Sequence, residues 1–461
     1  MNSKTIFEII YRTARELDYD VYVVGGYVRD KILGIKDKDL DFVIIGDALT
    51  FAELLKKRMH LRKIVVYPRF GTFMANYYGY TLEFVNAREE SYSSDSRKPQ
   101  TKRSDLPADL SRRDFTINTL AMDISPHNFG KIIDVYDGQG DLKRGIIRTP
   151  LEPIQTFSDD PLRMMRAVRF ATRLNFKIEE NTYKAIKSSA YRLKIVSQER
   201  ITDEFNRIIM GKNPDKGIMM LDDVGLLQEF LPELVKAKGI EQRRDFHHKD
   251  VFYHTLEVLH NTAEKSRKLG LRLAALFHDI GKPKTKKFIE SSGWTFHGHE
   301  VVGERMTGGI MRRMKYPANT IEYVKKLVRL HLRPMAMVSD IVSDSAIRRL
   351  LFLAGDDVDD LMILCRADIT SKNRRRVKEY LNNYDHVVKR MKEVEERDRI
   401  RNFQPPVDGR EIMEKFGIKP GPQIGKIKKF VEEAILNGEA PNEHDACLNL
   451  IIEHKEELGI K

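Results

Sequence analysis

Only two of the 461 residues are cysteines, Cys365 and Cys447, and they form no Cys-x-x-Cys pair. A disulfide framework and a zinc ribbon are therefore excluded, and a reducing cytoplasm is the expected location. The chain also lacks any run of about 18 to 20 apolar residues, so we expect no membrane span. Its first residues have the pattern of an amphipathic helix, and we expect no signal peptide.

Acidic residues are in the minority. Lys and Arg number 80 against 68 Asp and Glu, which gives a net charge of +12 and favours a polyanionic partner such as a nucleic acid. The contents of 41% hydrophobic and 32% charged residues are those of a globular protein. At roughly 150 residues per domain, the length predicts about three domains.

The hydrophobic pattern predicts an α+β fold, with a small sheet at the head and a mostly helical body. Alternating or apolar runs predict strands at Val21 to Val24, Leu40 to Ile45, Phe70 to Tyr78 and Tyr80 to Ala87, the last two forming a hairpin around Gly79. Helices are predicted at Tyr27 to Leu33 and Phe51 to Met59, the second opened by a capping box of Thr50 and Glu53. From Asp159 onward, 3.6-residue periodicity dominates and no strand-rich segment returns.

Three acidic residues of the head form a candidate metal site. Asp39 and Asp41 are two positions apart in a predicted strand, so both carboxylates emerge on one face with their Cα atoms about 6 to 7 Å apart. Such a pair can bridge two Mg²⁺ ions. Glu83, the sole acid of an apolar strand, is the candidate third carboxylate. An Asp-x-Asp pair also occurs by chance in turns and strand caps, so the surrounding motifs decide its meaning.

A glycine pair precedes these acids. Gly25 and Gly26 join a predicted strand to a predicted helix, where backbone N–H groups can approach phosphates. Arg29, just inside that helix, can add a charge-assisted contact to a phosphate oxygen. The closeness of this turn to Asp39 and Asp41 predicts a nucleoside triphosphate site.

At this point the motifs become specific. The segment Val24-Gly-Gly-Tyr-Val-Arg-Asp-Lys-Ile-Leu-Gly34, followed by Asp39-Leu-Asp41, resembles the head signature of class II tRNA nucleotidyltransferases, a family that also contains bacterial poly(A) polymerases. Further motifs match in order: Arg112-Arg113-Asp114-Phe115-Thr116-Ile117-Asn118, the run from Asp137 to Arg148, the run from Asp159 to Phe170, and Glu199 to Glu204. The resemblance covers residues 20 to 210.

The resemblance implies a role for each matching position. Asp39 and Asp41 hold the metal ions, with Glu83 as third acid, and Gly25, Gly26 and Arg29 cradle the triphosphate. The remaining nucleotide-binding residues that it implies are Arg112, Arg113, Asp114, Asn118, Asp160, Arg163, Arg166 and Arg169. The polar segment from Arg88 to Arg112 is interpreted either as a mobile loop used in switching from C to A or as a solvated connection.

Asp160 and Arg163 also have a chemical argument. Three positions apart near a helix start, they can present an acceptor beside a donor. Cytosine and adenine each offer an amino donor next to a ring-nitrogen acceptor, whereas uracil and guanine present the reverse order. This pair therefore accepts C and A and leaves buried polar groups unpaired against U and G. A surface salt bridge is the alternative interpretation.

A second cluster resembles the signature of HD phosphohydrolases. His278-Asp279 ends an apolar helical run and is followed by Ile280-Gly281-Lys282. The residues that the resemblance assigns to the metal site are His254, His278, Asp279, His299, His331 and Asp368. Imidazole with carboxylate suits Mn²⁺, Fe²⁺, Co²⁺, Ni²⁺ or Zn²⁺, and a bound metal can activate water against a phosphoester.

These observations predict four parts: a nucleotidyltransferase head at 1–147, a helical neck that recognises the base at 148–238, an HD domain at 239–400 and a helical, tRNA-contacting tail at 401–461. The basic stripe of Arg163, Arg166, Arg169 and Arg173 is interpreted as a solvated face or as a tRNA contact.

The expected reaction is template-independent addition of CCA to the 3′ end of tRNA from CTP and ATP, with Mg²⁺ as cofactor and pyrophosphate as product. The alternatives are an A-adding enzyme or poly(A) polymerase, or an HD phosphohydrolase that acts on RNA or nucleotide phosphoesters. The oligomeric state stays open.

Overall fold

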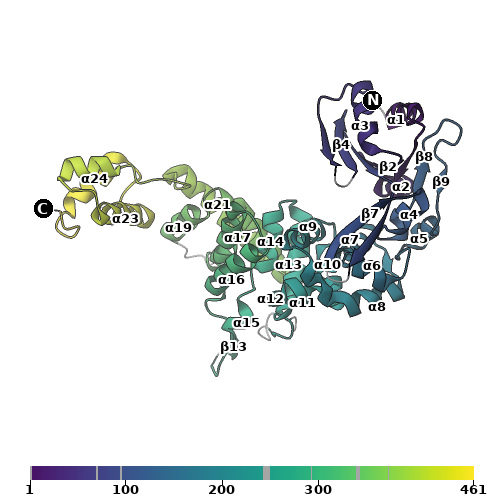
Figure 1. Ribbon diagram of the computed structural model, residues 1–461. Helices are drawn as coiled ribbons and strands as arrows, with labels where there is room; N and C mark the ends of the chain where they lie inside the picture. The colour runs from purple at the N-terminus through teal and green to yellow at the C-terminus, as the bar shows by residue number, and fades with distance from the viewer. Residues whose placement is uncertain are drawn as a thin grey trace. The chain divides into compact units, whose positions relative to one another are not determined.

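The structure is a computed structural model that describes residues 3–68, 71–93, 96–241, 250–291, 293–338, 343–371 and 373–460, without the side chains of 89–101 and 103. The chain forms two compact units (Figure 1). The first comprises Met1–Gly211 and Lys216–Phe230, and the second comprises Lys212–Asp215 and Leu231–Lys461. The four-part division by sequence stays a prediction.

The first unit contains a seven-stranded mixed sheet in the order β3-β4-β5-β2-β1-β8-β9. Its pairs are antiparallel except for β2 and β5, which are parallel. The strands are β1 (Asp20–Val24), β2 (Asp39–Ile45), β3 (Ile64–Tyr67), β4 (Thr72–Tyr77), β5 (Tyr80–Asn86), β8 (Ala121–Asp123) and β9 (Ile132–Ile133). The α+β class is confirmed, and so is the hairpin around Gly79 in its described part; Phe70 lies outside the described residues.

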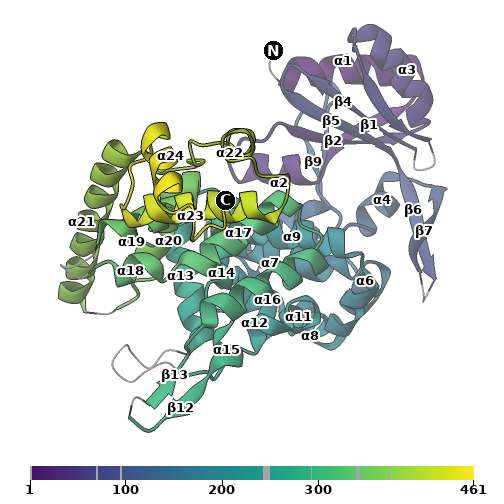
Figure 2. The same ribbon diagram turned by 90° about the vertical axis from the view of Figure 1, so that its left-hand side faces the viewer.

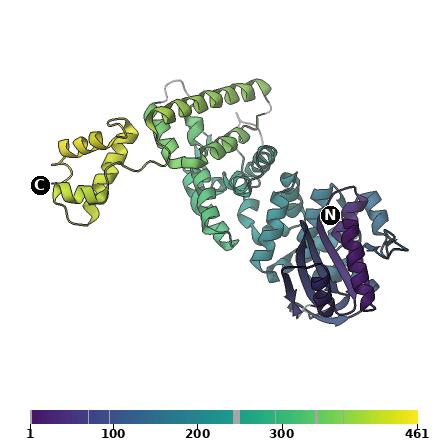
Figure 3. The same cartoon turned by 90° about the horizontal axis from the view of Figure 1, so that it is seen from above.

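Side-chain alternation gives the sheet two different faces. Phe42 of β2 and Phe84 of β5 stack on one face and pack against α1 (Ser3–Glu16) and α3 (Ala48–Arg58), which lie over that face (Figure 3). The residues next in sequence, Asp41 and Glu83, therefore face the opposite side. An apolar cluster that includes Val24, Val43 and Leu110 forms the core there.

Helix α2 (Gly26–Ile32) lies between β1 and β2 in the chain, and α4 (Leu106–Ser111) precedes β8. The other helices of this unit are α5 (Gly138–Arg144), α6 (Pro153–Asp159), α7 (Leu162–Leu174), α8 (Glu180–Ser189), α9 (Gln198–Ile209) and α11 (Leu226–Phe230), together with α10 (Pro214–Asp223) from residue 216 onward. Helix α7 alternates apolar and basic positions, and its buried face includes Met164, Val168 and Ala171.

Two expectations about local structure were wrong. Helix α3 begins earlier than predicted, because Asp47 and not Thr50 caps it by accepting from the Thr50 N–H. The segment after Arg88 is not an irregular loop: it forms an antiparallel hairpin of β6 (Arg88–Ser93) and β7 (Ser96–Arg103), followed by α4. The largely helical body after Asp159 is confirmed. Among the described residues, the strands outside the head sheet and the β6–β7 hairpin are two or three residues long: β10 (Ile146–Ile147) pairs with β11 (Lys177–Ile178), and β12 (Lys287–Ile289) with β13 (Gly293–Thr295).

The second unit is largely helical. Five of its helices end or begin next to the HD motif residues: α13 (Val251–Lys265), α14 (Leu269–Phe277), α16 (His299–Arg313), α17 (Ala318–Leu330) and α20 (Val358–Ala367). The other helices of this unit are α12 (Pro232–Val235), α15 (Lys282–Thr285), α18 (Arg333–Ala336), α19 (Asp344–Ala354), α21 (Arg374–Asp398), α22 (Gly409–Phe416), α23 (Pro422–Asn437) and α24 (His444–Glu453). In the described part of the chain, none of the helices has the length and apolar character required to cross a membrane.

The stacked rings under the sheet are expected to determine the stability of the first unit. Phe84 is fully buried between Phe42 and Phe73, with ring centroids 4.6 and 4.4 Å away. We predict that Phe84→Ala lowers the free energy of unfolding by about 3 to 5 kcal/mol. The matched control Tyr67→Ala, at a half-exposed ring on β3, changes it by less than about 0.5 kcal/mol. Urea titration of both variants measures the difference, and a loss below about 1 kcal/mol for Phe84→Ala contradicts the prediction.

Candidate active site and metal cluster

The strand register brings two of the predicted metal-site acids together. Asp41 on β2 lies beside Glu83 on the parallel strand β5 and opposite Val24 on β1, so both carboxylates face the same side of the sheet. Asp39, two residues earlier on the same strand, lies on this side too and is exposed. The sequence signal that selected Glu83, a single acid in an apolar strand, thus identified the neighbour of Asp41.

Asp41 is held in an unfavourable electrostatic environment. Burial raises the pKa of its carboxyl to about 6, and the negative charges of Glu83, Asp39 and Asp37 add to the rise while Arg113 opposes it. A cluster of carboxylates that resists ionisation fits a cation site, because a bound divalent ion removes the repulsion between them.

The glycine turn lies against the same carboxylate. Gly25 has φ +70°, and a Cβ atom there would lie 3.0 Å from Nη1 of Arg113 and 3.6 Å from Oδ2 of Asp41. Any side chain at this position would therefore be strained and would also crowd both charged groups. The turn leaves open the space between Asp41 and Arg113.

Asp114 connects the head to α7. Its Oδ1 accepts from Nδ2 of Asn118 at 2.9 Å, and its Oδ2 accepts from Nε of Arg166 at 2.7 Å. Burial opposes ionisation, but the charge of Arg166 and these hydrogen bonds outweigh it and lower the pKa of Asp114 to about 2. Asn118 Oδ1 in turn accepts from Nη1 of the buried Arg29 at 2.7 Å. The predicted triphosphate and ribose residues thus form one hydrogen-bonded chain.

Arg169 is held in place by an acid from α9. Its Nε lies 2.7 Å from Oε2 of the buried Glu204, while burial lowers the pKa of Arg169 to about 10. Arg173 on the same helix contacts Asp30 at 3.2 Å. Together with the Arg166 to Asp114 pair, these contacts turn the basic stripe of α7 inward, toward acids of the same unit.

The two predicted base-reading residues have partners of their own. Asp160 lies in the turn before α7 and accepts from Nη2 of Arg200 at 2.7 Å and from the Leu162 N–H at 3.2 Å. Arg163 donates to the carbonyl oxygen of Arg112 at 2.5 Å. A carboxylate has about four acceptor sites and a guanidinium five donors, so each retains capacity for a base.

A single cavity of about 750 Å³ joins these groups. Every predicted head residue borders it except Asp39 and Glu83. Its further lining includes Asp37, Phe170, Arg173, Glu199, Arg200, Asp203, Glu204 and Arg207. The motif from Glu199 to Glu204 was predicted from the family resemblance with no role for its members. The spacing of Arg200 and Glu204 places them on one face of a helix, but it identifies no partner for either.

The HD motif residues meet at the ends of five helices. Two groups of three residues among those described could each hold a metal ion. Within each group, the three ligand atoms lie within 4.8 Å of one another. The groups are His254, His278 and Asp368, and Asp279, His299 and His331. All six residues predicted for this site are therefore brought together.

Asp279 bridges the two groups. Its Oδ2 lies 3.2 Å from Nε2 of His278, and its Oδ1 lies 3.3 Å from Nε2 of His299 and 3.9 Å from that of His331. On the other side, Oδ1 of Asp368 is 2.9 Å from Nε2 of His254. One carboxylate between two imidazole pairs fits a centre for one or two divalent cations.

The orientation of the rings supports metal binding. Nδ1 of His278, His299 and His331 lies 2.8, 2.8 and 2.7 Å from a backbone carbonyl oxygen, and such a carbonyl accepts only from a protonated Nδ1. The Nε2 atoms of these three rings then carry lone pairs, yet those of His299 and His331 lie only 3.4 Å apart. A cation between them satisfies this geometry. Burial disfavours the imidazolium, but Asp279 and Asp368 raise the pKa of His278 to about 10, which indicates the same demand for positive charge.

Comparisons with known proteins match three stretches of the chain. Three family models match: "Poly A polymerase head domain" over residues 21–148, "Probable RNA and SrmB- binding site of polymerase A" over 175–238, and "HD domain" over 251–391. An A-adding tRNA nucleotidyltransferase of Deinococcus radiodurans is 33% identical over 350 residues, which cover 74% of this chain and 78% of the relative. The chain belongs to the tRNA nucleotidyltransferase family.

Members of this family with different names are similar to the chain. A CC-adding tRNA nucleotidyltransferase of Thermus thermophilus is 29% identical over 93% of this chain and 92% of its own. A multifunctional CCA protein of Neisseria gonorrhoeae is 35% identical over 68% of this chain and 73% of its own.

Solved structures share the fold of this nucleotidyltransferase. The Bacillus stearothermophilus CCA-adding enzyme in complex with CTP has a TM-score of 0.65 at 22% identity, covering 99% of both chains. The Thermotoga maritima CCA-adding enzyme complexed with tRNA has a TM-score of 0.60 at 23% identity, covering 97% of this chain and 95% of its own.

The raised pKa of Asp41 predicts a pH-dependent stability. A carboxyl whose pKa is higher in the folded than in the unfolded chain favours folding when protonated, so this contribution is lost as the pH rises from about 4 through 6. Asp41→Asn removes the charge. We predict that, in EDTA, the variant is more stable than the parent by on the order of 1 to 3 kcal/mol at pH 8 and by much less at pH 4.

Calorimetry of both proteins at the two pH values measures this difference. Glu453→Gln, at an exposed carboxylate on α24, serves as control and shows no such pH-dependent gain. Equal stability of Asp41→Asn and parent at pH 8 would show that the Asp41 charge is not repelled in the fold.

Proposed function

We propose that this nucleotidyltransferase adds CCA to the 3′ end of tRNA, one nucleotide at a time, from CTP and ATP and without a nucleic-acid template. The observation that supports the proposal is the single cavity in which Asp41 and the glycine turn meet the Asp114 network and the pair Asp160 and Arg163. Its volume of about 750 Å³ has room for a nucleoside triphosphate. The related enzymes act in tRNA maturation, so we assign the reaction to the cytoplasm.

In this mechanism the 3′-hydroxyl of the tRNA attacks the α-phosphate in line, and pyrophosphate leaves. Asp39 and Asp41, with Glu83 beside them, are the proposed ligands of Mg²⁺, which when bound neutralises the triphosphate and lowers the pKa of the attacking hydroxyl. Arg113 lies on the other side of the space left by Gly25, where its guanidinium can bind a phosphate oxygen. Asp114 and Asn118 position Arg29 and Arg166 around the nucleotide.

Base selection is assigned to Asp160 and Arg163. The carboxylate accepts from the amino group of cytosine or adenine, and the guanidinium donates to the adjacent ring nitrogen. Arg200 orients Asp160 for this contact. Uracil and guanine present the opposite pattern, so binding them leaves these groups without partners.

A three-substrate extension assay tests the proposal. Purified protein with Mg²⁺ receives tRNAs that end before CCA, after C and after CC, with CTP and ATP supplied separately and together. We predict ordered growth to CCA followed by a stop. Asp41→Ala is expected to reduce addition by at least about 1,000-fold while tRNA binding, measured by filter retention, stays within a factor of about 3.

The other outcomes identify the alternatives. Addition of A to the CC end alone would make the protein an A-adding enzyme, addition of C alone a CC-adding enzyme, and long A tails a poly(A) polymerase. Normal addition by Asp41→Ala would exclude the metal assignment.

For the HD cluster we propose a second activity, metal-dependent hydrolysis of phosphoesters. The observation that favours it is that Asp279 contacts histidines of both groups, His278 on one side and His299 on the other. Its donor set suits Mn²⁺, Fe²⁺, Co²⁺, Ni²⁺ or Zn²⁺, and such an ion supplies an activated water when bound. Lys282, whose Nζ lies 2.6 Å from Oδ2 of Asp279, adds positive charge for a phosphate group.

Two variants, each at a single histidine, separate the two activities. We predict that His278→Ala removes Mn²⁺- or Ni²⁺-dependent hydrolysis of p-nitrophenyl phosphate and leaves the rate of nucleotide addition within a factor of about 2. The control His386→Ala, at an exposed site on α21, retains both activities. Hydrolysis that persists in His278→Ala would show that another site is its source.

A further inference from the structure

The only tryptophan of the chain is exposed on a hairpin of the second unit. Strands β12 and β13 form the hairpin (Figure 2). Trp294 on β13 lies opposite Phe288 on β12, so both rings are on the same face of the two-stranded sheet. Their centroids are 5.2 Å apart, and the residues are 40% and 62% exposed. Large aromatic rings in this state are available for stacking by a ligand.

The hairpin is also strongly basic. Residues 282–295 contain four lysines, Lys282, Lys284, Lys286 and Lys287, and a single acid, Glu290. Nζ of Lys286 lies 4.3 Å from the centroid of the Trp294 ring. Within the described residues, no carboxylate lies within 4.0 Å of the ammonium groups of Lys284, Lys286 and Lys287. The positive charge around the rings is therefore uncompensated by an ion pair.

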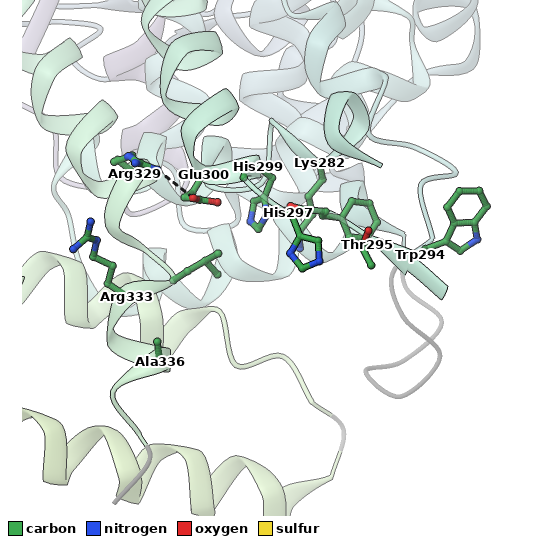
Figure 4. A pocket seen from close by; sticks show the side chains of 12 residues that line it. Lys282, Trp294, Thr295, His297, His299, Glu300, Arg329, Arg333 and Ala336 are labelled. Atoms are coloured by element: carbon green, nitrogen blue, oxygen red, sulfur yellow. Dashed lines mark hydrogen bonds and ion pairs between the residues drawn. The ribbon is translucent and has the colours of Figure 1, made fainter. Parts of the chain in front are cut away.

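A cavity connects this hairpin to the HD cluster. It has a volume of about 630 Å³ and extends from Trp294 past His297 to His299 and Lys282 (Figure 4). His299 contributes a ligand atom to the cluster, and Lys282 contacts Asp279. Arg333 lines the cavity away from Trp294, and Arg329 beside it is paired with Glu300. A chain of phosphates thus finds cationic groups along the way from the rings to the cluster.

We propose that β12, β13 and this cavity form a binding surface for single-stranded RNA. Bases stack on Trp294 and Phe288, and the phosphates follow Lys286 and Lys287 toward Lys282 and Arg333. Exposed aromatic rings combined with a basic groove are the features by which proteins bind single strands. A protein partner fits less well, because lysine is depleted in protein interfaces.

The proposal concerns binding and stands without the hydrolysis proposed for the HD cluster. The hydrolysis matters only for the fate of a bound strand whose end reaches the HD cluster. Binding measured in His278→Ala protein separates the two, because this variant lacks a cluster ligand and retains the hairpin.

The single tryptophan makes the experiment direct, since its fluorescence reports on this surface alone. Titration with a ten-nucleotide oligo(A) is expected to quench Trp294 saturably, with the apparent affinity falling as salt rises by a log–log slope of about −0.7 per phosphate contacted. The same strand in a blunt duplex, whose bases are already stacked, and inorganic phosphate are expected to leave the fluorescence unchanged.

Variants test which groups are responsible. Phe288→Ala keeps the reporter and is expected to weaken binding about 10-fold. Lys286→Gln with Lys287→Gln is expected to reduce the magnitude of the salt slope by about 1. Lys265→Gln with Lys392→Gln, two exposed lysines on α13 and α21, is the matched control and changes neither quantity. Circular dichroism verifies that each variant is folded.

Several results overturn the proposal. These are absence of quenching, equal quenching by duplex and single strand, and affinity unchanged by both the Phe288 and the lysine variants. A fluorescence change that follows protein concentration without RNA would identify the hairpin as an interface between copies of the chain instead.

Discussion

One constraint organises both candidate sites: an ionised carboxylate that is removed from water must be surrounded by groups that stabilise its charge. Asp114 meets this constraint with Asn118 and Arg166, and Asp279 meets it with imidazoles on two sides. In each case the partners come from different helices or strands, so the charge determines how those elements approach one another. Removing either carboxylate would leave its buried hydrogen-bond and ion-pair partners without an acceptor. Each site therefore depends on its carboxylate for the arrangement of the surrounding side chains.

Asp41 is the exception to this pattern. Its neighbours Glu83, Asp39 and Asp37 carry the same charge, and Arg113 alone opposes them. The fold therefore keeps this site in a state that favours a proton or a cation. The sheet tolerates the repulsion between these carboxylates because the stacked phenylalanines of β2 and β5 lie directly behind the acids, on the other face. The apolar face supplies the stability that the acidic face lacks.

Much of this arrangement could be predicted from the sequence, because it depends on local periodicity and on contiguous motifs. The strands at β1, β2 and β5 were identified in this way, and the class of fold was confirmed. The six HD residues came from the resemblance to HD phosphohydrolases, and the structure brings them together. The wrong predictions concern positions where several local arrangements are possible. Asp47 and not Thr50 caps α3, and the polar segment after Arg88 forms the hairpin of β6 and β7. The links from Arg200 to Asp160 and from Glu204 to Arg169 join residues 35 or more positions apart, which no single-sequence pattern reveals.

The contact between Arg200 and Asp160 bears on the base selection proposed for Asp160 and Arg163. Asp160 accepts from Arg200, and Arg163 donates to a backbone carbonyl. A base must therefore share or replace these partners, and it gains binding energy only when it offers a donor to the carboxylate and an acceptor to the guanidinium. A base with the reverse order adds an acceptor against an acceptor and a donor against a donor, while the resident partners stay in place. In this proposal the internal contacts hold both groups in place for a base that matches their free donor and acceptor sites, as cytosine and adenine do and uracil and guanine do not.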